Sequence, residues 1–312
     1  MIEVEGLSKS FGWRNPVAAV SDISFHVDNG SIFGLLGPVN AGKTTLMRIL
    51  ATALKPSSGT VRIGGFDTMA QTREVRELIG YMPETMDFST WGSGPDYLRF
   101  WARVTGLSGA GEKARIAELS DFLQIPEGLK GNPETYTVGV QKRLMLAQAL
   151  YSDPEVLLLD EPLTGTAGED RGFLMSRLED LRRLGKTTVM ATPQLSEVQV
   201  LSDQVSVLLE GQATEAFPTA DLLRQVGEGR HARIFVKAGD LSSDALASVK
   251  RLSGVIEVKL TSVATVIYVD PGRVNVDLVR ETLEGAGAED ATVEAAEITL
   301  GDVFRAIVRE GS

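Results

Sequence analysis

The sequence of 312 residues contains no cysteine, which excludes disulfide bonds and thiolate metal sites and suits a reducing compartment. It also contains no apolar run approaching the ~18–20 residues that a membrane-spanning helix needs. The first five residues, Met1 to Glu5, are acidic in character and lack the basic and then apolar pattern of a signal peptide. These absences predict a chain without a membrane segment of its own.

Basic charge is scarce as well, because 31 Lys and Arg face 42 Asp and Glu, for a net charge of −11. This balance argues against binding nucleic acid through a broad basic face. It does not exclude a nucleotide, which needs only local hydrogen-bond donors. The hydrophobic fraction of 43% is ordinary for a globular protein, and the length suffices for one large domain and one small domain.

Short apolar strands alternate with helices in the first part of the chain. Ile32–Leu36 is predicted as a buried strand, and a helix is expected from Thr44 to Leu54, ending before a proline. Three further apolar runs are typical of buried parallel strands: Val156–Leu159, Thr187–Ala191 and Val205–Leu209. The pattern predicts an α/β domain.

The domain prediction divides the chain into three regions. Residues 1–217 form the large domain, in which residues 85–150 are helical in character. Residues 218–230 are polar and glycine-bearing and are predicted as a linker. Residues 231–312 have strand and helix patterns in the order βαββαβ, followed by a helix at 300–309. This order predicts a small ferredoxin-like α+β domain.

The most specific motif is a phosphate loop of the form GxxxxGK[ST], placed between the predicted strand and helix. Successive backbone N–H groups and a helix N-terminus converge on an anion in such a loop. Lys43 is predicted to reach the β- and γ-phosphates of ATP, and the Thr44 hydroxyl to bind Mg²⁺. The predicted phosphate contacts are Gly37, Pro38, Val39, Asn40, Ala41, Gly42, Lys43, Thr44 and Thr45.

Two carboxylates end the apolar run at Val156–Leu159. Asp160 falls at the C-terminal end of a buried strand, where open α/β sheets bind ligands, and is predicted to hold Mg²⁺. Glu161 is the candidate general base that orients a water toward the γ-phosphate. Together with the phosphate loop, these residues predict an ATP and Mg²⁺ site.

With these motifs, the chain resembles the ATP-binding cassette (ABC) family, and specifically the nucleotide-binding subunits of ABC-2-type exporters of the daunorubicin-resistance type. The resemblance covers essentially the whole chain, and the segment Thr299–Phe304 is similar to the closing motif of that branch. It implies a P-loop NTPase cassette with a mixed sheet core and a helical subdomain. By the same resemblance, Phe11 stacks on adenine. Glu84 occupies the Q-loop position, where glutamine is usual, and is a candidate Mg²⁺ ligand.

Besides Glu84, three segments depart more seriously from the family pattern. Residues 136–140 stand where the family has LSGGQ, a segment that closes over the nucleotide of a partner subunit. Here Thr137 and Gly139 fit the pattern, whereas Val138 puts a branched side chain where a glycine allows close approach. Ala167 replaces the D-loop aspartate, and Pro193 replaces the switch histidine.

The two histidines of the chain, His26 and His231, fall at neither position and do not substitute for the missing one. The chain is therefore expected to bind ATP and Mg²⁺ well and to hydrolyse ATP slowly, as the ATP-binding subunit of an exporter. The resemblance implies a permease on a separate chain, a second cassette of the same or a different sequence, and a place on the cytoplasmic face of the membrane. The alternative is an ATP-gated regulatory or assembly module that scarcely hydrolyses. A cassette acting in translation or DNA repair lacks support, because the chain has neither a second cassette nor a long coiled coil.

Overall fold

Parallel strands form the centre of the first of two units, residues 1–219 and 220–312, in the computed structural model. The structure describes residues 1–12, 14, 16–126, 128–221, 232–237, 241–260, 265–270, 272–288 and 290–296. Strands β3, β7 and β8 (Ile32–Leu36, Val156–Asp160 and Thr187–Thr192) are buried at every residue, as expected for strands covered on both faces.

The main sheet has the strand order β10-β9-β3-β8-β7-β6, with β11 also paired to β9. Strands β6 (Ile79–Met82), β7, β8, β3 and β9 (Gln204–Leu209) run parallel, whereas β10 (Gln212–Ala213) and β11 (Phe217–Pro218) are antiparallel to β9. The sheet is therefore mixed, and its parallel strands end together at one edge.

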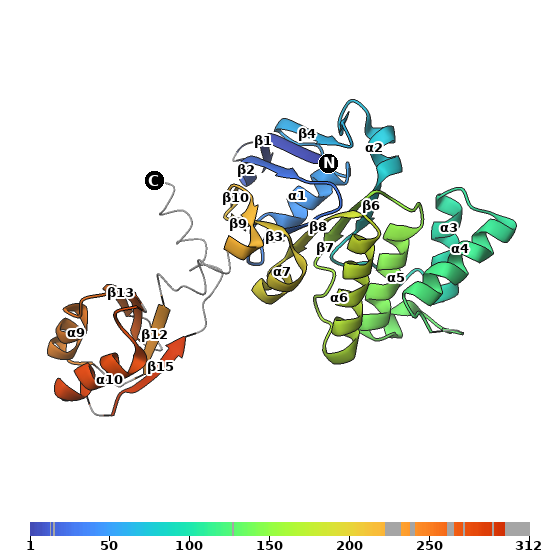
Figure 1. The fold of residues 1–312 in the computed structure, drawn as a ribbon. Helices are drawn as coiled ribbons and strands as arrows, with labels where there is room; N and C mark the ends of the chain where they lie inside the picture. Colours follow the sequence, from blue (N-terminus) through green and yellow to red (C-terminus); the bar gives the residue numbers. More distant parts are fainter. Residues whose placement is uncertain are drawn as a thin grey trace. The chain divides into compact units, whose positions relative to one another are not determined.

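A second, antiparallel sheet has the order β2-β1-β4-β5, formed by Val17–Val27, Ile2–Phe11, Ser58–Ile63 and Phe66–Asp67. Helix α1 (Lys43–Leu50) lies between this sheet and the parallel strands (Figure 1). One apolar core joins them, and in it the rings of Phe25 and Phe33 stack with centroids 4.8 Å apart. Helix α2 (Thr72–Leu78) precedes β6.

Helix α1 ends four residues earlier than the predicted Leu54. Thr52 has a φ of 57°, a left-handed conformation that stops the helix. The N–H groups of Ala53 and Leu54 then donate to the carbonyl of Arg48, at 2.9 and 3.1 Å. A helix-terminating turn, rather than the following proline, therefore sets the boundary.

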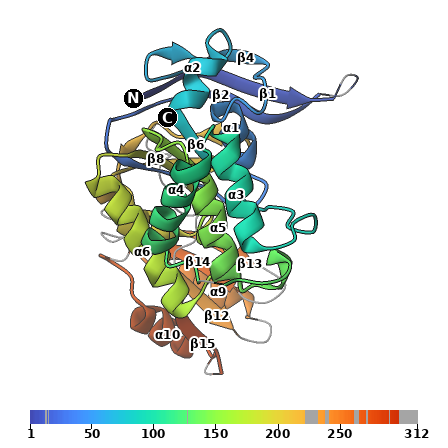
Figure 2. The same ribbon diagram turned by 90° about the vertical axis from the view of Figure 1, so that its right-hand side faces the viewer.

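The helical part of the first unit consists of α3 (Gly94–Val104), α4 (Gly109–Phe122) and α5 (Val138–Leu150), with a 3₁₀ turn at Pro133–Thr135. Helix α5 lies between α6 (Gly168–Arg183) and the pair α3 and α4 (Figure 1), and Figure 2 views these helices from the side of α3 and α4. A second apolar core holds the helices together and also includes Leu201 of α7 (Leu195–Leu201). Within the described residues, every helix is too short or too polar to cross a lipid bilayer.

The second unit has the predicted βαββαβ order. Its elements are β12 (Ala232–Lys237), α9 (Ser243–Lys250), β13 (Val255–Leu260), β14 (Thr265–Val269), α10 (Val276–Gly285) and β15 (Thr292–Ala296). The strands form one antiparallel sheet in the order β13-β14-β12-β15, which is ferredoxin-like, and an apolar core packs both helices on it. The predicted helix at 300–309 and the motif at 299–304 lie outside the described residues.

The first residue of the predicted linker at 218–230 belongs to a strand, because β11 continues through Pro218. Residues 219–221 are helical, and residues 222–230 lie outside the described residues.

Candidate nucleotide-binding site

The phosphate loop connects β3 to α1 at the edge where the parallel strands end. A Cβ on Gly37 would lie 2.4 Å from the carbonyl oxygen of Leu208, and a Cβ on Gly42 would lie 2.4 Å from that of Ala19. Gly42 also has a φ of 107°, a conformation that side chains rarely adopt. Close backbone packing therefore requires both glycines and leaves the loop tip, with Val39 72% exposed, open to solvent.

The Lys43 ammonium lies beneath this loop, and its side chain is only 4% exposed. Nζ donates to the carbonyl oxygens of Gly37 and Pro38, both at 2.9 Å, and lies 3.4 Å from Oε1 of Glu161. A phosphate that entered the loop would compete with these acceptors for the ammonium. The structure therefore joins the loop and the acidic strand end through one buried ion pair.

Asp160 ends strand β7 with its side chain fully buried. Neither carboxylate oxygen has a hydrogen-bond partner among the described residues. Burial raises the pKa of Asp160 to about 6, and the carboxylates of Glu84 and Glu161 add to this, whereas the Thr44 hydroxyl and Lys43 lower it. A buried carboxylate without a partner is a costly arrangement that a bound cation would relieve.

Mg²⁺ fits this arrangement. It takes oxygen ligands and is usually held by one or two carboxylates together with substrate phosphates and water. Asp160 and the Thr44 hydroxyl would hold the ion beside a nucleotide. Within the described part of the chain, no three Asp, Glu or His side chains are grouped so that they could hold a metal by themselves, and such a group is not required when phosphates complete the shell.

Glu161 has a left-handed backbone, with a φ of 50°. Its N–H donates to the carbonyl of Ala191 at 2.9 Å, and its Oε2 accepts from the Thr164 hydroxyl at 2.9 Å. A positive φ in a long side chain is uncommon, and it costs on the order of 1–3 kcal/mol unless the surroundings impose it. The strand end therefore holds the Glu161 carboxylate toward Lys43 at the expense of local strain.

Glu84 lies two residues beyond β6 and is exposed. Its carbonyl oxygen accepts from Nζ of Lys142 at 2.9 Å, and the same ammonium donates to the carbonyl oxygen of Glu161 at 2.8 Å. Lys142 is 6% exposed, and burial lowers the pKa of its ammonium while the surrounding carboxylates oppose the shift. This residue was missed by sequence reasoning, although the sequence carried a signal. Lys142 shares one helix face with buried Met145, Leu146 and Ala149.

The segment at residues 137–139 begins helix α5. The Thr137 hydroxyl accepts from the N–H of Val140 at 3.4 Å and so caps the helix. Val138 is 42% exposed, and its Cγ1 would lie 3.2 Å from a Cβ on Gly165. The Asp170 carboxyl carbon is 2.2 Å from the position of a Cβ on Gly139. This segment thus packs on residues 165 and 170 of its own chain.

The two other altered positions carry no polar side chain. Ala167 is the N-cap of α6 and makes no side-chain capping bond. Pro193 follows β8, where the preceding Thr192 hydroxyl donates to Glu197 and accepts from the N–H of Gln194. Proline supplies neither a side-chain donor nor an N–H at this place.

Phe11 ends strand β1 with its ring 46% exposed. The Lys9 ammonium lies 5.2 Å from the ring centroid. An exposed aromatic face can stack on a base. The ring therefore has the exposure that the predicted adenine contact needs.

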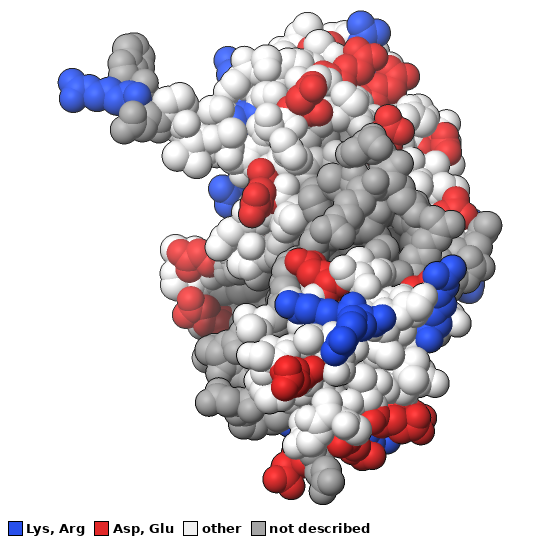
Figure 3. Space-filling view, turned by 90° about the vertical axis from the view of Figure 1, so that its left-hand side faces the viewer, with Lys and Arg blue, Asp and Glu red and all other residues white. Residues whose placement is uncertain are grey.

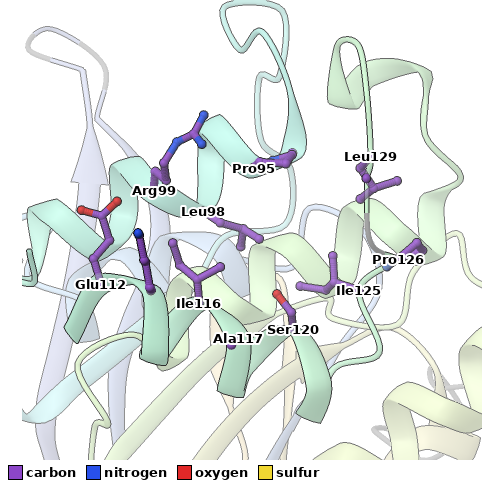
Figure 4. A pocket seen from close by; sticks show the side chains of 13 residues that line it. Pro95, Leu98, Arg99, Glu112, Ile116, Ala117, Ser120, Ile125, Pro126 and Leu129 are labelled. Atoms are coloured by element: carbon purple, nitrogen blue, oxygen red, sulfur yellow. The ribbon is translucent and has the colours of Figure 1, made fainter. Parts of the chain in front are cut away.

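A separate cavity of about 380 Å³ lies in the helical part, between α3 and α4. Figure 4 shows Leu98 of α3 and Ile116 of α4 between the two helices, with Ile125, Pro126 and Leu129 at one end. Apolar side chains dominate its walls, so the cavity does not extend the charged site.

Charged side chains are mixed on the surface shown in Figure 3. Lys and Arg form small separate groups among Asp and Glu on this face. The absence of nucleic-acid binding stays a prediction.

Comparison with known proteins matches residues 20–164 to the family described as ABC transporter. The Nod factor export ATP-binding protein I of Paraburkholderia xenovorans is 33% identical over 227 residues, which are 72% of this chain and 74% of that protein. The daunorubicin resistance ATP-binding protein DrrA3 of Streptomyces coeruleorubidus is 29% identical over 303 residues, covering 97% of this chain and 94% of that protein.

Among solved structures, the chain is similar to the ATP-binding cassette MJ0796, a dimer in a post-hydrolysis state bound to ADP and Pi. The TM-score is 0.64 at 20% identity, over 70% of this chain and 99% of that one. This likeness shows the fold.

Proposed function

Since the chain belongs to the ABC transporter family of ATP-binding proteins, we propose that it is the ATP-binding subunit of an ABC-2-type membrane exporter that hydrolyses ATP slowly. The relatives named for Nod factor export and daunorubicin resistance support the exporter assignment. In this role the chain binds Mg-ATP at the phosphate loop and drives or gates a separate permease.

One observation carries the proposal: the buried Lys43 ammonium lies between the phosphate loop and Glu161, beside the unpartnered carboxylate of Asp160. These groups provide a cation for the phosphates, an Mg²⁺ ligand and a candidate base for water. By contrast, the signature segment and the switch position, which are expected to act on the γ-phosphate, are altered at Val138 and Pro193. Losing a positioned proton-transfer partner typically costs ~10²–10⁴ in rate, and losing one charge-stabilising donor costs ~10²–10³.

The helical part is the proposed contact with the permease. A groove of about 470 Å³ is lined there by Trp91, Asp96, Arg99, Phe100, Arg103 and Val104. Phe100 and Val104 are 46% and 57% exposed, so apolar surface is available to a partner. Contact with a permease would hold the chain at the cytoplasmic face of the membrane.

A second cassette is the other proposed partner, because residues 137–139 are expected to close over the nucleotide of a facing subunit. In a homodimer, both sites would combine the intact phosphate loop with Val138 and lack the histidine. With a different cassette, the site at this chain's Lys43 would gain a regular signature segment and still lack the histidine at Pro193. The small second unit is proposed to contribute to this pairing or to its regulation.

Titration calorimetry of the full chain with Mg-ATP tests the binding half of the proposal. Lys43→Ala is the control, because it removes the ammonium, and it is expected to weaken binding by ~10-fold or more. We expect calorimetry to show heat of binding from the wild type, and we expect phosphate release to be slow when turnover is measured. Absence of heat would refute ATP binding, and brisk turnover by a homodimer would refute slow hydrolysis. Affinity isolation from the native cell with mass spectrometry identifies the permease and the second cassette.

The alternative is an ATP-gated module that assembles or regulates a membrane complex with almost no turnover. The altered residues Val138, Ala167 and Pro193 favour it, and the position of Glu161 beside Lys43 opposes it. Glu161→Gln distinguishes the two functions in vivo. Loss of function in the cell supports the exporter, whereas full function supports the module.

A further inference from the structure

Lys142 connects two loops of the site. Strands β6 and β7 are parallel neighbours in which Met82 is paired with Leu159. Glu84 and Glu161 each lie two residues beyond this pair, past the end of the ladder of hydrogen bonds between the strands. The ammonium of Lys142 donates to both of their carbonyl oxygens, at 2.9 and 2.8 Å. The side chain therefore holds together two strand ends that the sheet no longer joins.

The burial of this ammonium is costly and needs a reason. Burying an isolated cation is strongly unfavourable, and only partners and hydrogen bonds offset the cost. Two carbonyls bind it directly, and the negative charges of Glu161, Glu84, Asp160 and Glu197 favour the charged form. A glutamine or methionine of similar length would fill the space without this cost, so the charge itself is the informative feature.

Lys142 belongs to the second turn of helix α5, which begins at Val138 in the altered signature segment. A shift of α5 would therefore pull directly on the backbone of Glu161, whose carboxylate contacts Lys43, and on that of Glu84. The same ammonium places a fixed positive charge beside the acidic strand end.

We infer that Lys142 is a positioning residue of the ATPase reaction. It ties the signature helix of its own chain to the backbone of Glu84 and Glu161, so that helix and carboxylates move together. The inference rests on the proposed function, because it assumes that Mg-ATP binds at the phosphate loop. This link lies within one subunit and involves neither of the altered positions Ala167 and Pro193.

The test replaces Lys142 by methionine, which keeps the length of the side chain and removes its charge and donors. Arg115→Met is the matched control. Arg115 also donates to two backbone carbonyls, those of Leu150 and Tyr151, but at the far end of α5. Lys142→Arg restores donors and charge. Thermal melting of each variant verifies folding, and Lys142→Gln replaces the methionine variant if that one does not fold.

Tryptophan fluorescence reports on the helical part without requiring turnover. The chain has three tryptophans, and in a Trp13→Phe background the remaining two are Trp91 and Trp101, both in that part. Mg-ATP is expected to change their emission in the wild type and in Arg115→Met. Lys142→Met should lose most of this change while its calorimetric affinity for Mg-ATP stays within about threefold. Turnover should fall by ~10²-fold, as expected for a displaced catalytic group, and Lys142→Arg should recover part of both.

The outcomes separate the inference from the proposed function. If the wild type gives no heat with Mg-ATP, ATP binding itself fails. If Lys142→Met binds Mg-ATP and keeps both the full fluorescence change and wild-type turnover, the positioning role is refuted. It is refuted equally if Arg115→Met loses as much of both signals as Lys142→Met, because the effect is then one of general packing.

Discussion

The ion pair between Lys43 and Glu161 makes a quantitative prediction for the variant Glu161→Gln. The ammonium and the carboxylate lie 3.4 Å apart with side chains 4% and 9% exposed, so solvent screens them little. ATP has to attract the ammonium away from this carboxylate, which also repels the γ-phosphate. Glutamine keeps the shape and removes the charge. We therefore expect the variant to bind Mg-ATP more tightly and to hydrolyse it more slowly.

The size of the gain follows from the distance. At 3.4 Å and an effective dielectric constant of about 20, two unit charges attract by about 5 kcal/mol, which is an upper limit. Most of this attraction energy does not appear as a gain in ATP affinity, because Lys43 keeps the carbonyls of Gly37 and Pro38 as acceptors. A net gain of about 1.4 kcal/mol corresponds to tenfold tighter binding. Turnover should fall by ~10²-fold or more if Glu161 is the base.

Calorimetry with Mg-ATP and Mg-ADP provides the assay. ADP lacks the γ-phosphate, so its gain should be clearly smaller than that of ATP. Glu155→Gln makes the same chemical change at an exposed position before β7 and serves as the control. The reasoning is refuted if Glu161→Gln binds ATP no more tightly than the wild type, or if ADP gains as much as ATP.

Three further predictions concern the altered and buried positions. Pro193→His should raise phosphate release by ~10-fold or more, whereas Gln194→His, one residue away, should not; equal rates would remove Pro193 as the cause of slow turnover. Burial raises the pKa of Asp160 from 3.8 to about 6. Between these two pH values the native chain keeps a proton that the unfolded chain has released, so the free energy of unfolding falls as the pH rises through this range. Without nucleotide, Asp160→Asn should therefore be more stable than the wild type by about 1–3 kcal/mol near about pH 7.5, and only slightly more stable near about pH 4. Urea unfolding at both pH values measures this stability difference, and a difference that does not change with pH would contradict the prediction. Gly139→Ala would place a Cβ 2.2 Å from the Asp170 carboxyl carbon and should lower the stability measured by thermal melting by about 1–3 kcal/mol. The same substitution in an Asp170→Ala background should lower the stability little. An equal loss in both backgrounds would show that the contact between residues 139 and 170 is not responsible.

The fold was predictable where the sequence pattern is local. The apolar runs of β3, β7 and β8 are continuous because both faces of these strands are covered, and their predicted ranges agree with the observed strands to within a residue. The short strands β10 and β11 were not predicted, because two residues give no periodicity and their pairing with β9 depends on tertiary contacts. The early end of α1 at Leu50 was missed for a similar reason, since the left-handed turn at Thr52 has no glycine to signal it.

The position of the phosphate loop and of the acidic strand end was predictable, whereas nucleotide binding there stays a prediction. The spacing of Gly37, Gly42 and Lys43 specifies a loop whose glycines the structure requires, and the acidic strand end lies beside it. Contacts between distant segments could not be predicted. The bonds from Lys142 depend on the register of β6 and β7, and the approach of Asp170 to Gly139 depends on how α5 and α6 pack.

The altered positions share a physical property that explains how the fold tolerates them. Thr137 keeps the hydroxyl expected in the signature segment, and it accepts a hydrogen bond as a helix cap. Thr192, which precedes Pro193, donates to Glu197. Val138 is half-exposed, and Ala167 makes no side-chain capping bond. Pro193 has no side-chain donor to lose. The residues at Val138, Ala167 and Pro193 therefore take part in neither of these two hydrogen bonds. The proposed slow hydrolysis is therefore compatible with the fold, which keeps the internal hydrogen bonds of Thr137 and Thr192.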